Sequence, residues 1–586
     1  MVQCSFHTLL HSVLRCCDSA LKQRERQAQI DALPAAYSAP LSDEEEKIHA
    51  LSLARLVTEC KSGSVAPKDI LAAYGKKTLS AQRLTNCITD FMFDQALEIA
   101  AFADYTSAGE SDAGSSTALN RNDCPLLGVP ISIKDTVNIR GHDTTLGMSK
   151  NVDCPVPTSA PIVRLLQDAG AIVHAKTTVP CALIGIETES DTFGRTTNPY
   201  NQNHSVGAST GGGGALVACG GSKIEIATDV GGSARIPAHF CGIWGLKGST
   251  GRFPMWGTIS SMMGLESVQI VAAPMAGSLA DLEEFWKRMV SMKPWTYDFT
   301  CVPLPWQKVD LQVEGRKLKW GVIWDDGVCE PTPACKRSLS IVVDALSAQG
   351  HEVVEFHPPK ISETLTVGYQ LVFSDGGVQM RDAGLPGETL NPPLKGTIGL
   401  LALPRFVKNI MAWWNRPTDP FYASLLNVMY PKSVLEQRAL VVRRDEIRAE
   451  WHKRWTEENL DFVLTVPHPL PALENGTGER ASLMSAGYSF LFNILNYTAG
   501  VLPVTFVDKA TDKLPSDFMS SPKFKAMNVI AKGAYSVYDA DKMHGLPLGV
   551  QIAGRVMQEE KVIEGMKVIE AVLKAEGKSF VPKVLV

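Results

Sequence analysis

One glycine-rich stretch of the chain, Gly207–Pro237, carries the strongest information about both fold and chemistry: GASTGGGGALVACGGSKIEIATDVGGSARIP. Two glycine-flanked segments in it each contain a serine, Ser209 in the first and Ser233 in the second. We expect glycine at this density to build no core of its own. It allows backbone to approach a ligand closely and successive N–H groups to point into one concavity.

The residues between and after the two serines predict regular elements. Residues 215–219 are expected to form a short helix, and residues 223–228 alternate apolar and polar side chains as a strand does. Ser233 then lies on a strand-to-helix turn, with the next element beginning at Ala234. A hydroxyl beside free N–H donors at a helix N-terminus can stabilise developing negative charge. The alternative is an ordinary glycine-rich loop whose serines are incidental.

A second motif, Gly128–Asp135 (GVPISIKD), indicates a strand that ends in a lysine. Apolar Val129, Ile131 and Ile133 alternate in it with Ser132 and Lys134. A lysine at a strand end is ordinarily solvated. This one lies 75 residues before Ser209, and Ser233 follows 24 residues after that.

In that order the three residues resemble the Ser–Ser–Lys triad of the amidase signature family, and the pattern is most similar to fungal acetamidase-like amidases. Three further motifs carry the resemblance: FGRTTNP at 193–199, FCGIWGLK at 240–247 and GLPLGVQIAG at 545–554. It implies the amidase signature α/β fold, with a mixed central β-sheet covered by helices on both faces. It also implies one catalytic domain over residues 106–586, preceded by a helical segment over residues 1–105.

The resemblance assigns a role to each member of the triad. Ser233 would attack the amide carbonyl and Ser209 would relay its proton. Lys134 would be the base, which requires a neutral amine, and burial lowers a lysine pKa by up to several units. The family also implies a cis peptide bond between Ala208 and Ser209.

The oxyanion hole and its support follow from the same resemblance. Backbone N–H groups of Val230, Gly231, Gly232 and Ser233 would hold the oxyanion. Asp229 and Arg235 flank the nucleophile loop and are expected to pair and brace it, and Thr210 is a further supporting residue. Four positions depart from the family pattern, because Ala208, Thr210, Gly213 and Gly277 replace a glycine, a serine, a glutamate and an arginine.

Other assignments of the same residues remain open. Residues 207–211 match the G-x-S-x-G nucleophile elbow, which has to follow a strand, whereas the residues before it are polar. His204 or His239 could serve a Ser–His mechanism, although packing roles fit both. A non-catalytic scaffold, an amidotransferase subunit and an allophanate hydrolase are further alternatives, disfavoured by the intact triad and by family motifs that extend to Gly554.

The composition of the chain limits the classes of binding partner and cofactor that we expect. A net charge of −5 argues against nucleic acid. Thirteen cysteines without any C-x-x-C suit a reducing cytoplasm and give no metal signature, so we expect no metal or cofactor. There is no signal-peptide pattern and no apolar run of about 18 residues that would span a membrane. The expected partner is a small-molecule amide, with a homodimer as an option.

The remaining chain is less informative. Residues 1–105 are expected to be helical, with an amphipathic face at Leu9–Leu14, and residues 106–123 a surface loop. The variable region 294–420 contains a β-α-β pattern near residues 318–356. Its apolar segment Gly399–Trp414 could line an acyl pocket or rest on lipid, and the pocket wall is favoured. We therefore expect a small to medium uncharged amide as substrate, with a long-chain fatty amide as the alternative.

Overall fold

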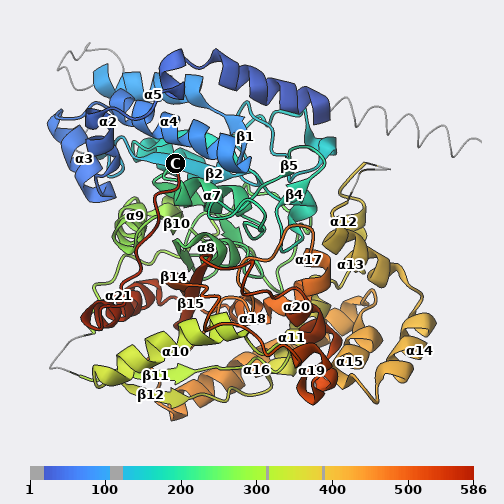
Figure 1. Cartoon of the computed structure of the whole chain (residues 1–586). Coiled ribbons are helices and arrows are strands. Elements are labelled where there is room, and N and C mark those ends of the chain that lie inside the picture. Colours follow the sequence, from blue (N-terminus) through green and yellow to red (C-terminus); the bar gives the residue numbers. More distant parts are fainter. Residues whose placement is uncertain (1–18, 106–122, 312–315, 386–387, 389) are drawn as a thin grey trace, which may run out of the picture.

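The computed structural model describes residues 19–105, 123–311, 316–385, 388 and 390–586, and an eleven-stranded sheet runs through them (Figure 1). The strand order is β1-β3-β2-β6-β10-β8-β14-β15-β13-β11-β12. The strands are β1 (Ile88–Phe91), β2 (Pro130–Lys134), β3 (Ile172–Thr177), β6 (Ile224–Ile226), β8 (Trp244–Lys247), β10 (Met275–Ala276), β11 (Lys319–Val322), β12 (Glu352–Glu355), β13 (Phe462–Thr465), β14 (Ala499–Phe506) and β15 (Pro547–Ala553).

The sheet is mixed, as predicted. β2 is parallel to β3 and β6, and β11 is parallel to β12 and β13, whereas the strands between these groups pair antiparallel. Helix α10 (Pro333–Ala348) connects β11 to β12 and completes the predicted β-α-β unit. Two further two-stranded pairs are β4 (Glu189–Ser190) with β5 (Gly194–Arg195), and β7 (Thr228–Asp229) with β9 (Val271–Ala272).

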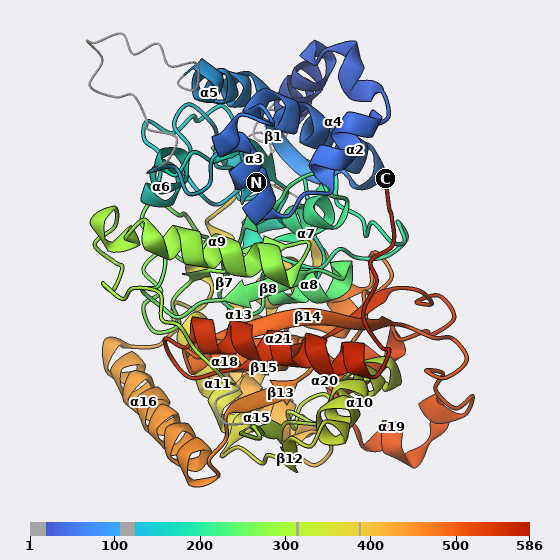
Figure 2. The same ribbon diagram turned by 90° about the vertical axis from the view of Figure 1, so that its left-hand side faces the viewer.

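Strands β2 and β6 have one apolar and one polar face, because successive side chains of a strand point to opposite sides. Ile131, Ile133, Ile224 and Ile226 pack in one core with side chains of α6 (Pro161–Asp168) and α9 (Leu279–Ser291). Figure 2 shows α9 and α21 (Glu559–Ala575) lying across this side of the sheet. The opposite face of the two strands carries Ser132, Lys134 and Glu225 beneath α7 (Gly211–Ala218). The polar face positions the site.

The glycine run contributes to this packing, which corrects the expectation that it builds no core. Helix α7 begins at Gly211, and all four glycines of the run are buried. A Cβ at Gly212 would overlap the Thr178 nitrogen and the Cys87 carbonyl oxygen. The absence of side chains therefore lets the helix lie directly on neighbouring backbone.

The N-terminal region is mostly helical, with one strand that the sequence did not indicate. Residues 19–32 are helical, and α2 (Asp43–His49), α3 (Leu53–Ser62), α4 (Pro67–Thr85) and α5 (Phe93–Tyr105) follow. Ser42 starts α2 through a capping box with Glu45. β1 follows α4 and pairs antiparallel with β3, so this region supplies the edge strand of the central sheet. Four fully buried residues are too few to show an alternating pattern. Leu9–Leu14 and most of the predicted loop at 106–123 lie outside the described residues.

The remaining helices cover the lower half of the molecule in Figure 1 and the region around α7. The Gly399–Trp414 segment is divided between α13 and α14, with the break at Leu403 and Pro404. Within the described part of the chain no helix has the length and apolarity to cross a bilayer. These helices are α8 (Arg235–Cys241), α11 (Ile361–Val372), α12 (Val378–Arg381), α13 (Pro392–Ala402), α14 (Arg405–Asn415), α15 (Pro420–Val428), α16 (Val434–Glu457), α17 (Gly478–Ala481), α18 (Gly487–Ile494), α19 (Pro522–Ala526) and α20 (Val529–Ser536).

Candidate active site

Lys134 ends β2 and is buried, with 1% of its surface exposed. Its Nζ lies 2.8 Å from Ser209 Oγ, 3.2 Å from the carbonyl oxygen of Thr228 and 3.0 Å from Thr228 Oγ1. Ser209 stands just before α7, and the peptide bond between Ala208 and Ser209 is cis. The lysine and the first serine of the sequence pattern are thus in direct contact.

The surroundings of Lys134 favour a neutral amine. Burial lowers the pKa of Lys134 from its ordinary 10.5 to about 7, while the charges of Asp229 and Glu225 act in the opposite direction. A neutral amine has two hydrogens and one lone pair. The two oxygens of Thr228 can accept both hydrogens, which leaves the lone pair for the hydroxyl proton of Ser209.

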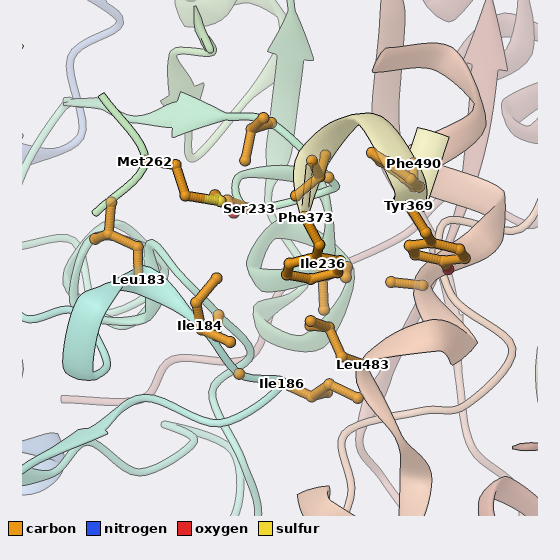
Figure 3. Close-up of a pocket in the computed structure, with 16 residues that line it drawn as sticks. Leu183, Ile184, Ile186, Ser233, Ile236, Met262, Tyr369, Phe373, Leu483 and Phe490 are labelled. Atoms are coloured by element: carbon orange, nitrogen blue, oxygen red, sulfur yellow. The ribbon is translucent and has the colours of Figure 1, made fainter. Parts of the chain in front are cut away.

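Ser233 lies in the turn between β7 and α8, and glycine is required beside it. Gly232 has a φ of +112°, and a Cβ there would come within 2.6 Å of Ser489 Cβ. The Thr210 N–H donates to the Ser233 carbonyl oxygen at 3.0 Å, which ties the Ser209 segment to the Ser233 segment. Ser233 is partly exposed and lines an apolar pocket (Figure 3).

The N–H groups around Ser233 differ in their availability. The Gly232 N–H donates to Asp229 Oδ1 at 2.9 Å, so it could serve an oxyanion only by sharing its proton. The N–H groups of Val230, Gly231 and Ser233 have no acceptor among the residues that the structure describes. Val230 and Gly231 line the pocket together with Ser233. Three donors are therefore free at the position expected for an oxyanion hole.

Asp229 and Arg235 form a fully buried, bidentate ion pair beneath this turn. Arg235 Nε donates to Asp229 Oδ2 at 3.0 Å, and Nη2 donates to Oδ1 at 2.8 Å. Arg235 also donates to Gln551 and Asn493, and the Asn493 amide donates to Asp229 Oδ1. Burial alone would raise the pKa of Asp229, but Arg235 holds it well below its usual range. The pair braces the nucleophile loop against α18 and β15.

The pocket at Ser233 is apolar, and about 650 Å³ of empty space lies within it and at its opening to solvent. Figure 3 shows aliphatic side chains around the serine, Phe373 near the middle of the view, and Tyr369 and Phe490 on its right-hand side. The aromatic residues are Tyr369 from α11, Phe373 directly after α11, and Phe490 from α18. The aliphatic residues that face the space include Leu183, Ile184, Ile186, Ile236, Met262 and Leu483.

A second hollow adjoins the first. The two share Tyr369, Phe373 and Leu483, and the second is lined further by Leu400 and Leu401 of α13. The predicted pocket-wall role thus agrees with the position of the first part of the Gly399–Trp414 segment. The second part, α14, carries four exposed apolar side chains: Phe406, Ile410, Trp413 and Trp414.

The alternative assignments find less support. A nucleophile elbow requires a strand that leads into the serine, but residues 206–210 form no strand. His239 accepts the Gly549 N–H and bonds the Leu470 carbonyl, and burial lowers its pKa to about 3. His204 sits in an isolated backbone bridge with Glu474. In the described ranges no group of three or more His, Cys, Asp or Glu residues could hold a metal ion.

Two site residues were not identified from the sequence, Thr228 and Glu225. Thr228 directly precedes Asp229, so its place next to the nucleophile segment was the available signal. Glu225 was visible as a charged residue inside the short apolar run 224–227. Four positions depart from the family pattern. At one of them, Gly213, a side chain would overlap Glu225, whereas nothing in the structure explains Gly277.

Comparison with known protein families agrees with this geometry. The Amidase family profile matches residues 69–563. The chain therefore belongs to the amidase family, whose members typically carry a triad and oxyanion hole of this kind, and it is an amide-hydrolysing enzyme.

The similar proteins include fatty-acid amide hydrolases and acetamidases. The chain is 31% identical over 532 residues to fatty-acid amide hydrolase 1 of Sus scrofa, covering 90% of this chain and 86% of that protein. It is likewise 31% identical over 530 residues to an acetamidase of Aspergillus oryzae, covering 89% and 90%. A solved fatty acid amide hydrolase superimposes with a TM-score of 0.79 at 26% identity, covering 94% of each chain.

Proposed function

We propose that this enzyme hydrolyses uncharged carboxylic amides of small to medium size that carry an apolar acyl group, through an acyl-enzyme on Ser233. The observation that carries the proposal is the 2.8 Å contact between Lys134 Nζ and Ser209 Oγ, beside Ser233 at an apolar pocket. The proposal assigns Ser233 as the nucleophile, Ser209 as the relay hydroxyl and Lys134 as the base.

In the first half-reaction Ser233 Oγ attacks the carbonyl carbon of the amide. Its proton passes to Ser209, whose own proton passes to the lone pair of Lys134. The carbonyl π electrons move onto oxygen, where the N–H groups of Val230, Gly231 and Ser233 stabilise the charge. When the intermediate collapses, the C–N bond breaks, and Ser209 returns a proton to the leaving nitrogen while Lys134 restores the proton of Ser209.

In the second half-reaction water attacks the Ser233 ester by the same relay, and the acid is released. The apolar lining holds the acyl group and gives no counter-charge to an ionic substituent. This is why an uncharged amide is proposed.

A long-chain fatty amide is the second candidate. The second hollow, which shares Tyr369, Phe373 and Leu483 with the first, offers further apolar surface to a longer acyl chain. Two of the relatives named above are fatty-acid amide hydrolases, and one is an acetamidase.

A series of primary amides with acyl chains from two to eighteen carbons decides between the candidates. The proposal expects kcat/KM to rise from acetamide to a medium-chain amide and then to fall. A continued rise to the eighteen-carbon amide would establish the second candidate. Absence of hydrolysis throughout the series, with a Ser233→Ala enzyme behaving identically, would refute both.

A further inference from the structure

A buried carboxylate that the mechanism above does not use lies next to its base. Glu225 of β6 has no exposed surface and is the register partner of Ser132 in β2. It accepts hydrogen bonds from Ser132 Oγ at 2.5 Å and from Thr177 Oγ1 at 2.7 Å. Both donors are neutral hydroxyls, so within the described residues no cation is hydrogen-bonded to this carboxylate.

Lys134 lies on the same face of the sheet as Glu225. It follows Ser132 by two residues in β2, and alternate residues of a strand point to the same side. Its register partner in β3 is Thr177, one of the two residues that hold Glu225. The carboxylate and the amine therefore occupy adjacent positions on one face of the sheet.

The side chain of Glu225 fills the space that a side chain at position 213 of α7 would occupy. A Cβ on Gly213 would lie 2.5 Å from Glu225 Oε1 and would overlap Cδ and Cγ of the same side chain. Gly213 stands inside α7, and its φ is not among the positive values of the chain, so helical conformation does not require glycine there. The obstacle to a side chain at 213 is Glu225 itself.

We infer that Glu225 is a positioning residue of the amidase site, with its carboxylate in the place that a carboxylate at position 213 of α7 would occupy. The charge of Glu225 then affects how tightly Lys134 holds its proton. This inference rests on the proposed role of Lys134 as the base.

Glu225 and Lys134 each shift the pKa of the other. Burial raises the pKa of Glu225 to about 7, against the effects of Ser132, Thr177 and the charge of Lys134. An ionised Glu225 in turn raises the pKa of Lys134. The two groups therefore titrate as a coupled pair. When the pair holds a single proton, the groups are both neutral with that proton on Glu225 or both charged with it on Lys134, and at higher pH Lys134 is neutral beside an ionised Glu225.

Other charges around the pair are accounted for. Asp229 also raises the pKa of Lys134, but Arg235 pairs with it, and the buried Lys247 lies within its field. Glu225 also acts on the Cys87 thiol, whose pKa burial raises to about 12. Removing the charge of Glu225 should therefore act mainly on Lys134.

The first test is Glu225→Gln, which keeps the shape of the side chain and removes its charge. Ser132 and Thr177 can rotate their hydroxyls to suit an amide. We expect the acid limb of the kcat/KM–pH profile to move to lower pH by at least about half a unit. The matched control is Ser222→Ala, a neighbouring buried serine that bonds the Ser132 N–H and not the carboxylate, and it should leave the limb in place.

An unmoved acid limb in Glu225→Gln, with only a lower rate or stability, would overturn the inference. Lys134→Met separates this outcome from failure of the proposed function. If that variant keeps the wild-type acid limb, Lys134 is not the base, whatever Glu225 does.

A reciprocal exchange tests the shared space independently of the base. We expect Gly213→Glu and Glu225→Gly each to lower the melting temperature and to reduce kcat/KM at least about tenfold. The double variant should regain activity and melting temperature beyond the sum of the single effects, because one carboxylate again fills the space. Additive losses in the double variant would overturn the inference. If Glu225→Gln does not fold, this exchange of Gly213 and Glu225 still tests whether the two positions share one space.

Discussion

Replacement of Lys134 by methionine is the most informative single change, because the structure predicts opposite effects on rate and stability. Methionine keeps an unbranched side chain of similar volume but has no lone pair on nitrogen. With a Lys134 pKa of about 7, half of the wild-type molecules carry the neutral base at pH 7, and this fraction falls to about one tenth at pH 6 and about one hundredth at pH 5. Loss of a general base typically lowers the rate by about 10²–10⁴-fold.

The assay is kcat/KM on one medium-chain amide between about pH 5 and pH 9, for both enzymes. The wild-type profile should rise with pH and level off above about 7, near the pKa of Lys134. The Lys134→Met profile should be lower throughout and should lack that inflection. Equal rates, or the same inflection in both enzymes, would refute the assignment of Lys134 as base.

Stability should change in the other direction. The unfolded lysine titrates near pH 10.4, whereas the folded one titrates near 7, so at neutral pH the unfolded chain binds the proton more tightly. The difference of roughly 3 units corresponds to about 4 kcal/mol against the folded state at pH 7 and below, and this penalty fades as pH rises toward 10.4.

Methionine removes that penalty but also removes hydrogen bonds to Thr228 and Ser209, at about 1 kcal/mol each. We therefore expect Lys134→Met to unfold in urea with a free energy about 1–2 kcal/mol above wild type at pH 6–7 and with a weaker dependence on pH. A clearly less stable variant would contradict the desolvation argument.

Three further outcomes follow from the site. Asp229→Asn leaves Arg235 buried without its charge partner and should lower the free energy of unfolding by about 3–5 kcal/mol, measured by urea denaturation; a change below about 1 kcal/mol would contradict the bracing role. Phe373→Ala removes a side chain shared by the two hollows and should shift the preferred acyl chain to greater length, whereas an unchanged chain-length profile would exclude passage between them. Prolonged dialysis against a chelator should leave kcat unchanged, and a loss restored by zinc would refute the metal-independent mechanism.

The candidate site could be located because its residues lie in short, contiguous segments. Lys134 ends an alternating strand, both serines fall within one glycine-rich stretch, and the resemblance to the amidase signature family linked the three. The fold class followed from the same motifs and from the β-α-β pattern of β11, α10 and β12.

What could not be predicted depends on contacts between distant segments. The pocket takes Tyr369 from the variable region and Phe490 from α18, and no local pattern links them. Gly213 was visible only as a departure, because its explanation, Glu225, lies on a neighbouring strand. β1 was missed since four buried residues show no periodicity.

The central claim is that Ser233 is the nucleophile and that Ser209 and Lys134 activate it. The most direct measurement is covalent labelling with a fluorophosphonate probe, followed by mass spectrometry of the labelled peptide. We expect one adduct on Ser233, absent in Ser233→Ala and formed far more slowly in Lys134→Met. An adduct on Ser209, or labelling that persists unchanged in Ser233→Ala, would contradict it.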